Sequence, residues 1–326
     1  MQQVHRSRLQ IVERCKQPVI EDEIVQLYAN IHVQSFFLVF TKIPHHLPVS
    51  LPPHMQERYR HIFSNSMPRI FTSVSEAKRA LDLALNSIVQ LFSSCTSSAE
   101  SRVDKYAQHH ARLQQWDSAF QPLLIKAKAS TVNLNLEAKT APLVLSIYHR
   151  VAIIVLTGAV RRDETAYDSL RKEFSYIVST CRSVLDALAG PSTSTASSPR
   201  PRFSFDVGIV PPLYIVGTKC REPAPRRQAI ELLRRCPVQE GLWEPIGASR
   251  ICEWIMGIEE MGLAREGLDD EGGEAPVVRF VPEGNRVRLT GMQCELSKRR
   301  IWVKCKGVVP VTEDGLVKVW ENVIRW

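Results

Sequence analysis

The stretch that decides the fold runs from Phe203 to Glu260 and reads FSFDVGIVPPLYIVGTKCREPAPRRQAIELLRRCPVQEGLWEPIGASRICEWIMGIEE. It opens with an apolar segment, Ile209 to Val216, which contains two consecutive prolines, Pro211 and Pro212. Proline suits the first turn of a helix, because the N–H group that it lacks would have no partner there. The segment therefore predicts a helix that leads into the polar residues Lys219 to Arg221.

Two further helices are expected in the same stretch. One spans about Pro225 to Arg235 and ends before Pro237, because the residue that precedes a proline is disfavoured in the helical conformation. The other spans about Ala248 to Met261, where apolar residues recur at helical spacing. A turn with an aromatic anchor, Glu240 to Trp243, separates them. The stretch is thus predicted to form three helices joined by two corners.

Basic residues are dense in this stretch, and they allow two interpretations. In one, they form a surface for phosphate groups or for an acidic partner. In the other, the arginines pair with glutamates and lock the helix corners together, since arginine favours bidentate ion pairs. The sequence favours the second interpretation, because no aromatic residues for base stacking are interleaved. The basic residues are Lys219, Arg221, Arg226, Arg227, Arg234 and Arg235, and the candidate glutamates are Glu231, Glu240, Glu253, Glu259 and Glu260.

The chain upstream of this stretch is also predicted to be helical. Ser73 and Glu76 match a capping box, in which each side chain binds the other residue's backbone N–H. Asp163 can cap a later helix. Pro122 and Pro142 lie inside helical patterns and are expected to kink or restart those helices. We expect a mainly α fold, with about nine or ten helices in a layered or superhelical array.

The C-terminal part of the chain has a different pattern. Short β-branched or alternating segments at Val277–Phe280, Arg286–Leu289 and Ile301–Lys304 predict a small antiparallel sheet. A short helix near Leu316 to Ile324 is expected to follow it. The predicted division of the chain is a disordered segment 1–19, an N-terminal helical half 20–189, a flexible Ser/Thr/Pro-rich loop 190–202, a C-terminal helical half 203–265, and an acidic loop with the β tail 266–326.

The stretch 203–260 resembles the C-terminal part of the fungal-specific transcription factor domain, the regulatory region of fungal zinc-cluster transcription factors. The resemblance extends more weakly upstream and covers most of residues 20–265. It rests on Phe205-Asp206, Pro212-Leu213-Tyr214, Lys219-Cys220-Arg221, Arg226 to Ile230, Leu232-Leu233, Glu240 to Trp243 and Glu259-Glu260, and upstream on Phe71 to Ser73, Ala77, Trp116-Asp117 and Ala119-Phe120.

The resemblance implies a nuclear regulator of RNA polymerase II genes in a fungus. The partners that it implies are the transcription machinery, other regulators, or full-length family members as dimers. Such a regulatory body gates the activity of a transcription factor or recruits other proteins. One form of this hypothesis has it respond to a small molecule held between helices. A second hypothesis is a DNA-binding-deficient partner of full-length zinc-cluster factors.

The family's DNA-binding module holds two zinc ions with six closely spaced cysteines, and no segment of this chain matches it. The cysteines are scattered, and none are paired at the two-residue spacing of a zinc site. We therefore expect no zinc cluster and no other cofactor, and only indirect contact with DNA. Either the chain is an incomplete version of a longer factor or it is a stand-alone regulatory domain. The cysteines are Cys15, Cys95, Cys181, Cys220, Cys236, Cys252, Cys294 and Cys305.

Composition indicates a soluble intracellular protein without a membrane partner. The chain has 326 residues, 44% hydrophobic residues and a formal net charge of +8, which alone does not indicate nucleic-acid binding. Its start lacks the apolar core of a secretory signal. The most apolar run, Leu143 to Leu156, is interrupted by His149 and Arg150 and is predicted to be a core helix, too short and too charged to cross a bilayer.

The sequence contains no recognisable catalytic pattern. A phosphate-cradling glycine loop, a nucleophile elbow and a zinc-protease helix motif are all absent from it. His45 and His46 are adjacent in a proline-rich loop and are expected to be exposed rather than metal ligands. His149 is expected to be a hydrogen-bonded core residue. We therefore predict that the protein is not an enzyme, with an enzyme of unknown reaction as the weaker alternative.

Overall fold

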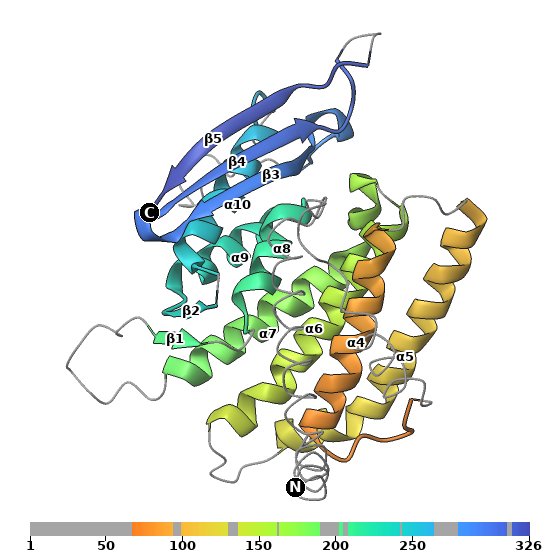
Figure 1. Ribbon diagram of the computed structural model, residues 1–326. Coiled ribbons are helices and arrows are strands. Elements are labelled where there is room, and N and C mark those ends of the chain that lie inside the picture. Colours follow the sequence, from red (N-terminus) through yellow and green to blue (C-terminus); the bar gives the residue numbers. More distant parts are fainter. Residues whose placement is uncertain are drawn as a thin grey trace, which may run out of the picture.

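The computed structural model describes residues 67–93, 99–129, 136–161, 163–189, 202–204, 208–241, 243–263, 280–311 and 315–326. These residues form seven α-helices, α4 to α10, followed by a three-stranded antiparallel sheet (Figure 1). The prediction of a mainly α fold with a C-terminal antiparallel sheet is confirmed. The histidine pair at 45–46 and the loop 190–201 lie outside the described residues, and the five-part division of the chain stays a prediction.

The N-terminal helices pack around α6. Helices α4 (Val74–Ser93), α5 (Ala99–Ala129) and α7 (Arg171–Ala189) all contact α6 (Leu136–Arg161). Trp116 lies fully buried among them, stacked against the rings of Phe120 and His149, and its indole N–H donates to the Ala77 carbonyl over 2.8 Å. Burial of apolar surface is therefore the main stabilising contribution in this layer.

The helix starts predicted at Ser73 and Asp163 are both capped, but one detail of each cap differs from the prediction. Ser73 Oγ accepts a hydrogen bond from the Glu76 N–H over 3.2 Å. The Glu76 carboxylate reaches back to the N–H and hydroxyl of Thr72, one residue earlier than a capping box requires. Asp163 accepts a hydrogen bond from the Thr165 N–H, but the helix that it caps is the 3-10 helix η1 (Glu164–Leu170), which leads directly into α7.

The prolines inside two helices do not restart them. Pro122 lies within α5 and Pro142 within α6, and both helices continue as single elements on either side. A proline removes one backbone hydrogen bond, and packing against neighbouring helices stabilises the remaining turns.

The apolar run at residues 143–156 lies in a helix that is longer than the run itself. This helix is long and apolar enough to cross a membrane by length and composition alone, so our argument that the run is too short and too charged was wrong. However, 72% of the helix's most apolar stretch is buried within the protein, as expected for a core helix.

Three helices form the second half of the helical body, as the sequence predicted. They are α8 (Val210–Lys219), α9 (Pro223–Arg235) and α10 (Pro245–Glu259), each with proline in its first turn. They contact one another, and α8 and α9 also pack against α7. Two short strands, β1 (Arg202–Ser204) and β2 (Val238–Glu240), pair in parallel beside them.

Glu240 has a different role from the one we considered. Its carboxylate accepts hydrogen bonds from the backbone N–H groups of Gly208, Ile209 and Val210 over 2.9–3.0 Å, so it caps the start of α8. It pairs with none of the predicted arginines. The N–H groups at a helix start have no partner within the helix, and a buried carboxylate satisfies several of them at once.

The sheet consists of β3 (Val287–Glu295), β4 (Arg300–Gly307) and β5 (Val319–Arg325), in that order. The predicted helix near Leu316 to Ile324 is wrong, because this segment is β5. Its β-branched residues suit a strand, and Ile324 pairs with Ile301 of β4 in the core. Of the predicted strand Val277–Phe280, only Phe280 is described, and it is exposed and irregular.

Candidate functional site at the helix corners

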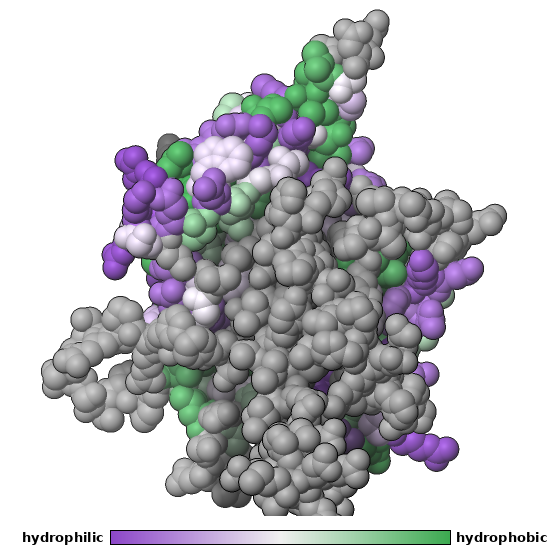
Figure 2. All heavy atoms as spheres, in the orientation of Figure 1, coloured by the Kyte–Doolittle hydropathy of each residue, from purple (hydrophilic) through white to green (hydrophobic). Residues whose placement is uncertain are grey.

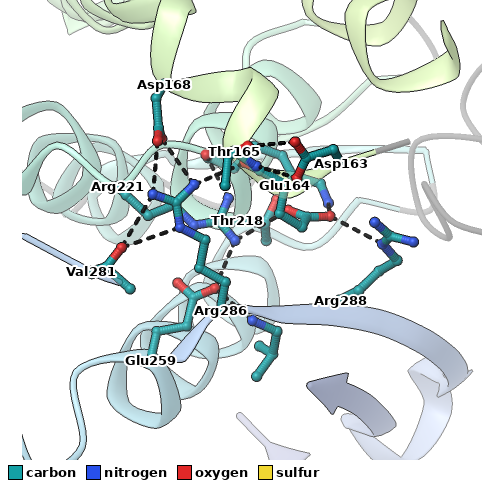
Figure 3. Close-up of polar contacts among 12 residues, drawn as sticks. Asp163, Glu164, Thr165, Asp168, Thr218, Arg221, Glu259, Val281, Arg286 and Arg288 are labelled. Carbon is teal, nitrogen blue, oxygen red and sulfur yellow. Dashed lines mark hydrogen bonds and ion pairs between the residues drawn. The ribbon is translucent and has the colours of Figure 1, made fainter. Parts of the chain in front are cut away.

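Buried charged residues meet where the helical body contacts the sheet, and we call this set the arginine junction (Figure 3). The members lie at the ends of secondary-structure elements or directly beside them: at the start of η1, at the end of α8, in the corner between α8 and α9, near the start of α9, at the end of α10 and in the residue before β3. All members are at most 7% exposed. They are Glu164, Lys219, Arg221, Arg226, Glu259 and Arg286.

Glu259 lies at the centre of the arginine junction and is fully buried. Its Oε1 accepts from Arg221 Nη2 over 2.7 Å and from the Val287 N–H over 3.0 Å. Its Oε2 lies 2.8 Å from Arg226 Nη2. Arg226 also donates through Nε to the Gly217 carbonyl at the end of α8 over 3.0 Å. One carboxylate thus joins α8, α9, α10 and β3.

Glu164 is the second buried carboxylate, and it extends the arginine junction to the N-terminal half. Its Oε1 accepts from Lys219 Nζ over 2.8 Å and from Arg288 Nε over 3.3 Å. Its Oε2 lies 3.2 Å from Arg221 Nη2. The guanidinium of Arg221 therefore bridges Glu164 and Glu259, two glutamates that lie far apart in the sequence.

Arg286 ties the sheet to η1. Its Nη1 donates to the Glu164 carbonyl over 3.0 Å, and its two terminal nitrogens form a bidentate pair with the Asp168 carboxylate over 3.1 and 2.8 Å. It also donates to the Val281 carbonyl. Charge-assisted bidentate bonds of this kind fix orientation as well as distance. The junction therefore fixes how the sheet lies on the helices.

The electrostatics keep the junction carboxylates ionised. Burial alone would raise the pKa of Glu164, but the charges of Lys219 and Arg221 outweigh it and lower the pKa to about 2. Burial is likewise outweighed at Glu259, where Arg221 and Arg226 lower the pKa. Both carboxylates are therefore ionised near neutral pH, where a lowered pKa makes a carboxyl group a poor general acid and a weak general base.

The six basic residues from the sequence fall into two groups. Lys219, Arg221 and Arg226 belong to the arginine junction and are buried. The others lie nearer the surface. Arg227 Nη2 donates to both carboxylate oxygens of Glu260 over 2.9 and 2.7 Å, Arg234 Nη2 lies 2.9 Å from Glu253 Oε1, and Arg235 is exposed at the end of α9.

Sequence reasoning missed the partners contributed by other segments. Glu164, Asp168 and Arg286 were not singled out, because Arg286 and Asp168 are 118 residues apart and no local pattern links them. Arg286 and Arg288 alternate with apolar residues along β3, which indicates a strand with a charged face. That signal does not reveal that Arg286 turns inward at the start of the strand.

His149 and two of the buried cysteines are held in unreactive states. His149 is buried, its Nε2 lies 3.0 Å from the Leu113 carbonyl, and burial lowers its pKa to about 4, so it is the hydrogen-bonded core histidine that we expected. Burial raises the pKa of the Cys220 thiol to about 11 and that of Cys236 to about 12. Within the described ranges, no group of three His, Cys, Asp or Glu side chains is arranged to hold a metal ion.

A search of curated proteins gave a partial match to a regulator. The chain is 35% identical, over 141 residues, to the aspercryptin biosynthesis cluster-specific transcription regulator atnN of Emericella nidulans. The match covers 41% of this chain and 21% of the regulator, so the chain spans about a fifth of the length of this relative. No protein-family model and no solved structure matches the chain. A homologue of this chain is thus a transcription regulator, which supports a regulatory role.

Proposed function

We propose that this chain is the regulatory body of a transcription regulator of RNA polymerase II genes in a fungal nucleus. It gates or recruits other proteins and does not itself read DNA. Two findings support the proposal. A homologue is a transcription regulator, and the stretch 203–260, whose residues resemble the fungal-specific transcription factor domain, forms a single packed unit of three helices.

The observation that carries the proposal is that three of the six basic residues at the helix corners are buried and point inward. Contact with DNA phosphates requires lysine and arginine side chains that reach solvent. Lys219, Arg221 and Arg226 are buried and paired with carboxylates instead. These three basic residues therefore hold the helix corners together, and this use of charge favours a regulatory body over a DNA-reading surface.

The same geometry argues against catalysis at this site. Active-site carboxylates usually keep a proton affinity that matches their task, whereas the arginine junction fixes its carboxylates as anions. The regulatory role of the homologue points in the same direction.

Chromatin immunoprecipitation of the tagged chain in its native cells tests the proposal. We expect enrichment at promoters, together with no sequence-specific shift when the purified chain alone meets the enriched DNA. Pull-down from the same cells then identifies what carries the chain to DNA; recovery of full-length zinc-cluster factors would favour the partner hypothesis.

A double variant tests whether the exposed charge at the end of α9 contributes. Replacement of Arg234 and Arg235 by glutamine removes two exposed charges at the end of α9, and we expect promoter enrichment to persist. A folded chain that is present in cells but enriched at no promoter would overturn the proposed function. Sequence-specific DNA binding by the purified chain would overturn the claim that it does not read DNA.

A further inference from the structure

Strand β5 forms one edge of the sheet among the described residues, and its backbone groups alternate in direction. The Gly307 N–H donates to the Lys318 carbonyl, and the Trp326 N–H donates to the Arg299 carbonyl. Residues 318 and 326 thus direct their backbone groups toward β4, and by the two-residue period of a strand so do 320, 322 and 324. The backbone groups of Val319, Glu321, Val323 and Arg325 consequently point along the opposite edge.

The β5 edge has charged side chains but neither a break nor a bulge that would prevent another strand from pairing with it. It contains no proline or glycine, and its pairing with β4 has no register shift. The other edge strand, β3, differs: it is irregular between Leu289 and Gly291, and its first N–H is bound by Glu259 of the helical body. Natural sheets protect their edges with bulges, charges or cover, so a long regular edge indicates a surface that can accept a strand.

The side chains on the outer face of β5 carry an unbalanced charge pattern. Arg325 lies directly opposite Arg300 of β4, and like charges at directly opposed positions destabilise a sheet. Arg300 is itself bound to Glu295. Glu321 lies opposite Lys304 and forms an ion pair with it. Between them, Val323 is 46% exposed beside Trp302, so the outer face of β5 carries an acidic, an apolar and a basic residue in turn. On the surface in view in Figure 2, hydrophilic and hydrophobic residues lie side by side on the sheet.

We propose that β5 pairs antiparallel with β5 of a second copy of this chain, around a two-fold axis at Val323. This register places Glu321 of each copy opposite Arg325 of the other, and Val323 opposite its own counterpart. Each Arg325 then gains a carboxylate beside its Arg300 neighbour. The same register puts residues with open backbone groups opposite one another, so the two three-stranded sheets form one continuous sheet of six strands.

The neighbouring register is less favourable. An axis at Asn322 also opposes open backbone groups, but it sets Glu321 against Val323 and Arg325 against Val319. The acidic and basic residues would then face apolar side chains, and the repulsion between Arg300 and Arg325 would persist. Charge complementarity therefore selects the axis at Val323. This inference does not rest on the proposed function.

The oligomeric state of the full chain tests the inference. Sedimentation velocity over a concentration series should show a monomer–dimer equilibrium for the native protein. Val323→Pro removes one N–H from the open edge and none from the β4–β5 ladder, so the fold should persist while dimers are lost. A native chain that stays monomeric throughout, or a folded proline variant that dimerises as before, would overturn the inference.

Two charge-reversal variants, tested alone and mixed, distinguish a lost interface from a folding defect. Glu321→Arg alone places arginine opposite arginine, and Arg325→Glu alone places glutamate opposite glutamate, so each should raise the dimer Kd by roughly tenfold or more. Mixed in equal amounts, the two variants restore both ion pairs and should form heterodimers near the native affinity. If each single variant dimerises like the native chain, or the mixture gains nothing over its components, the proposed register is refuted.

Discussion

Trp116 and Arg226 are among the largest side chains that are fully buried, yet their surroundings differ in kind. Trp116 lies in the N-terminal helical layer between aromatic rings, with one hydrogen bond to the Ala77 carbonyl. Arg226 lies in the arginine junction against Glu259 and the end of α8. The first region is stabilised by apolar burial, and the second by paired charges that were removed from water.

This difference determines how each region responds to damage. Loss of apolar contacts costs free energy in proportion to the surface and volume removed. Loss of one member of a buried ion pair costs about 3–5 kcal/mol even when the shape of the side chain is kept, because the remaining charge has neither water nor a partner. The helical layer should therefore tolerate conservative substitutions, whereas the arginine junction should tolerate none that remove a single charge.

The largest expected effect is that of Glu259→Gln. It leaves Arg221 and Arg226 buried without their shared carboxylate, and we expect a loss of about 3–5 kcal/mol in the free energy of unfolding. Urea denaturation followed by circular dichroism measures it. The control is Glu253→Gln, which breaks the more exposed pair with Arg234 and should cost less than about 1 kcal/mol. Equal losses in the two variants would contradict the distinction between buried and exposed pairs.

The second-largest effect should come from acid, which lowers the free energy of unfolding by protonating a carboxylate of the arginine junction. The pKa of Glu164 falls from 4.5 to about 2 on folding. A lowered folded-state pKa adds stability above the unfolded value, and that stability is lost as the pH falls from about 4.5 toward 2. The lost stability amounts to about 3 kcal/mol for this group. Unfolding free energies measured through this range should fall, and in Glu164→Gln the slope should be smaller; an unchanged slope would show that Glu164 is not the group responsible.

A conservative change in the helical layer should have an intermediate effect. Trp116→Phe keeps an aromatic ring but removes volume and the hydrogen bond to the Ala77 carbonyl. We expect a loss of about 2 kcal/mol, measured by urea denaturation under the conditions used for Glu259→Gln. A loss larger than that of Glu259→Gln would reverse the comparison between the two regions.

Glu240 extends the comparison, because it is a buried carboxylate that has no paired cation among the residues that the structure describes. Burial raises its pKa to about 7, although three backbone N–H bonds oppose the rise. A raised folded-state pKa adds stability at low pH, and that stability is lost as the pH rises through 7. Between pH 6 and pH 8 we expect the free energy of unfolding to fall by about 1 kcal/mol. Glu240→Gln should remove this dependence; its persistence would assign the titration to another group.

Local patterns in the sequence were sufficient for much of the fold. Helical spacing and proline positions located α8, α9 and α10, and the caps at Ser73 and Asp163 marked real starts. These features depend on neighbours within a few residues, so the sequence displays them directly. The mainly α class follows from the same local patterns.

The remaining features depend on distant partners. β5 was taken for a helix although its β-branched residues suit a strand, because the segment is short and the pairing with β4 that decides its conformation is not visible in the local sequence. Glu240 was considered as a partner for an arginine, whereas the N–H groups that it binds lie 30–32 residues upstream. Glu164 and Arg286 were missed because ion pairs across the molecule leave no periodic trace in the sequence.

A double-mutant cycle on Arg226 and Glu259 tests the central claim most directly, namely that the basic residues of the helix corners stabilise the body through buried ion pairs. The free energies of unfolding are measured for the native chain, Arg226→Met, Glu259→Gln and the double variant. We predict that the two losses are strongly non-additive, with a coupling of about 2 kcal/mol or more, because the second substitution removes a charge that the first left unpaired. Additive losses would contradict the account, since they would mean that the two side chains stabilise the protein independently.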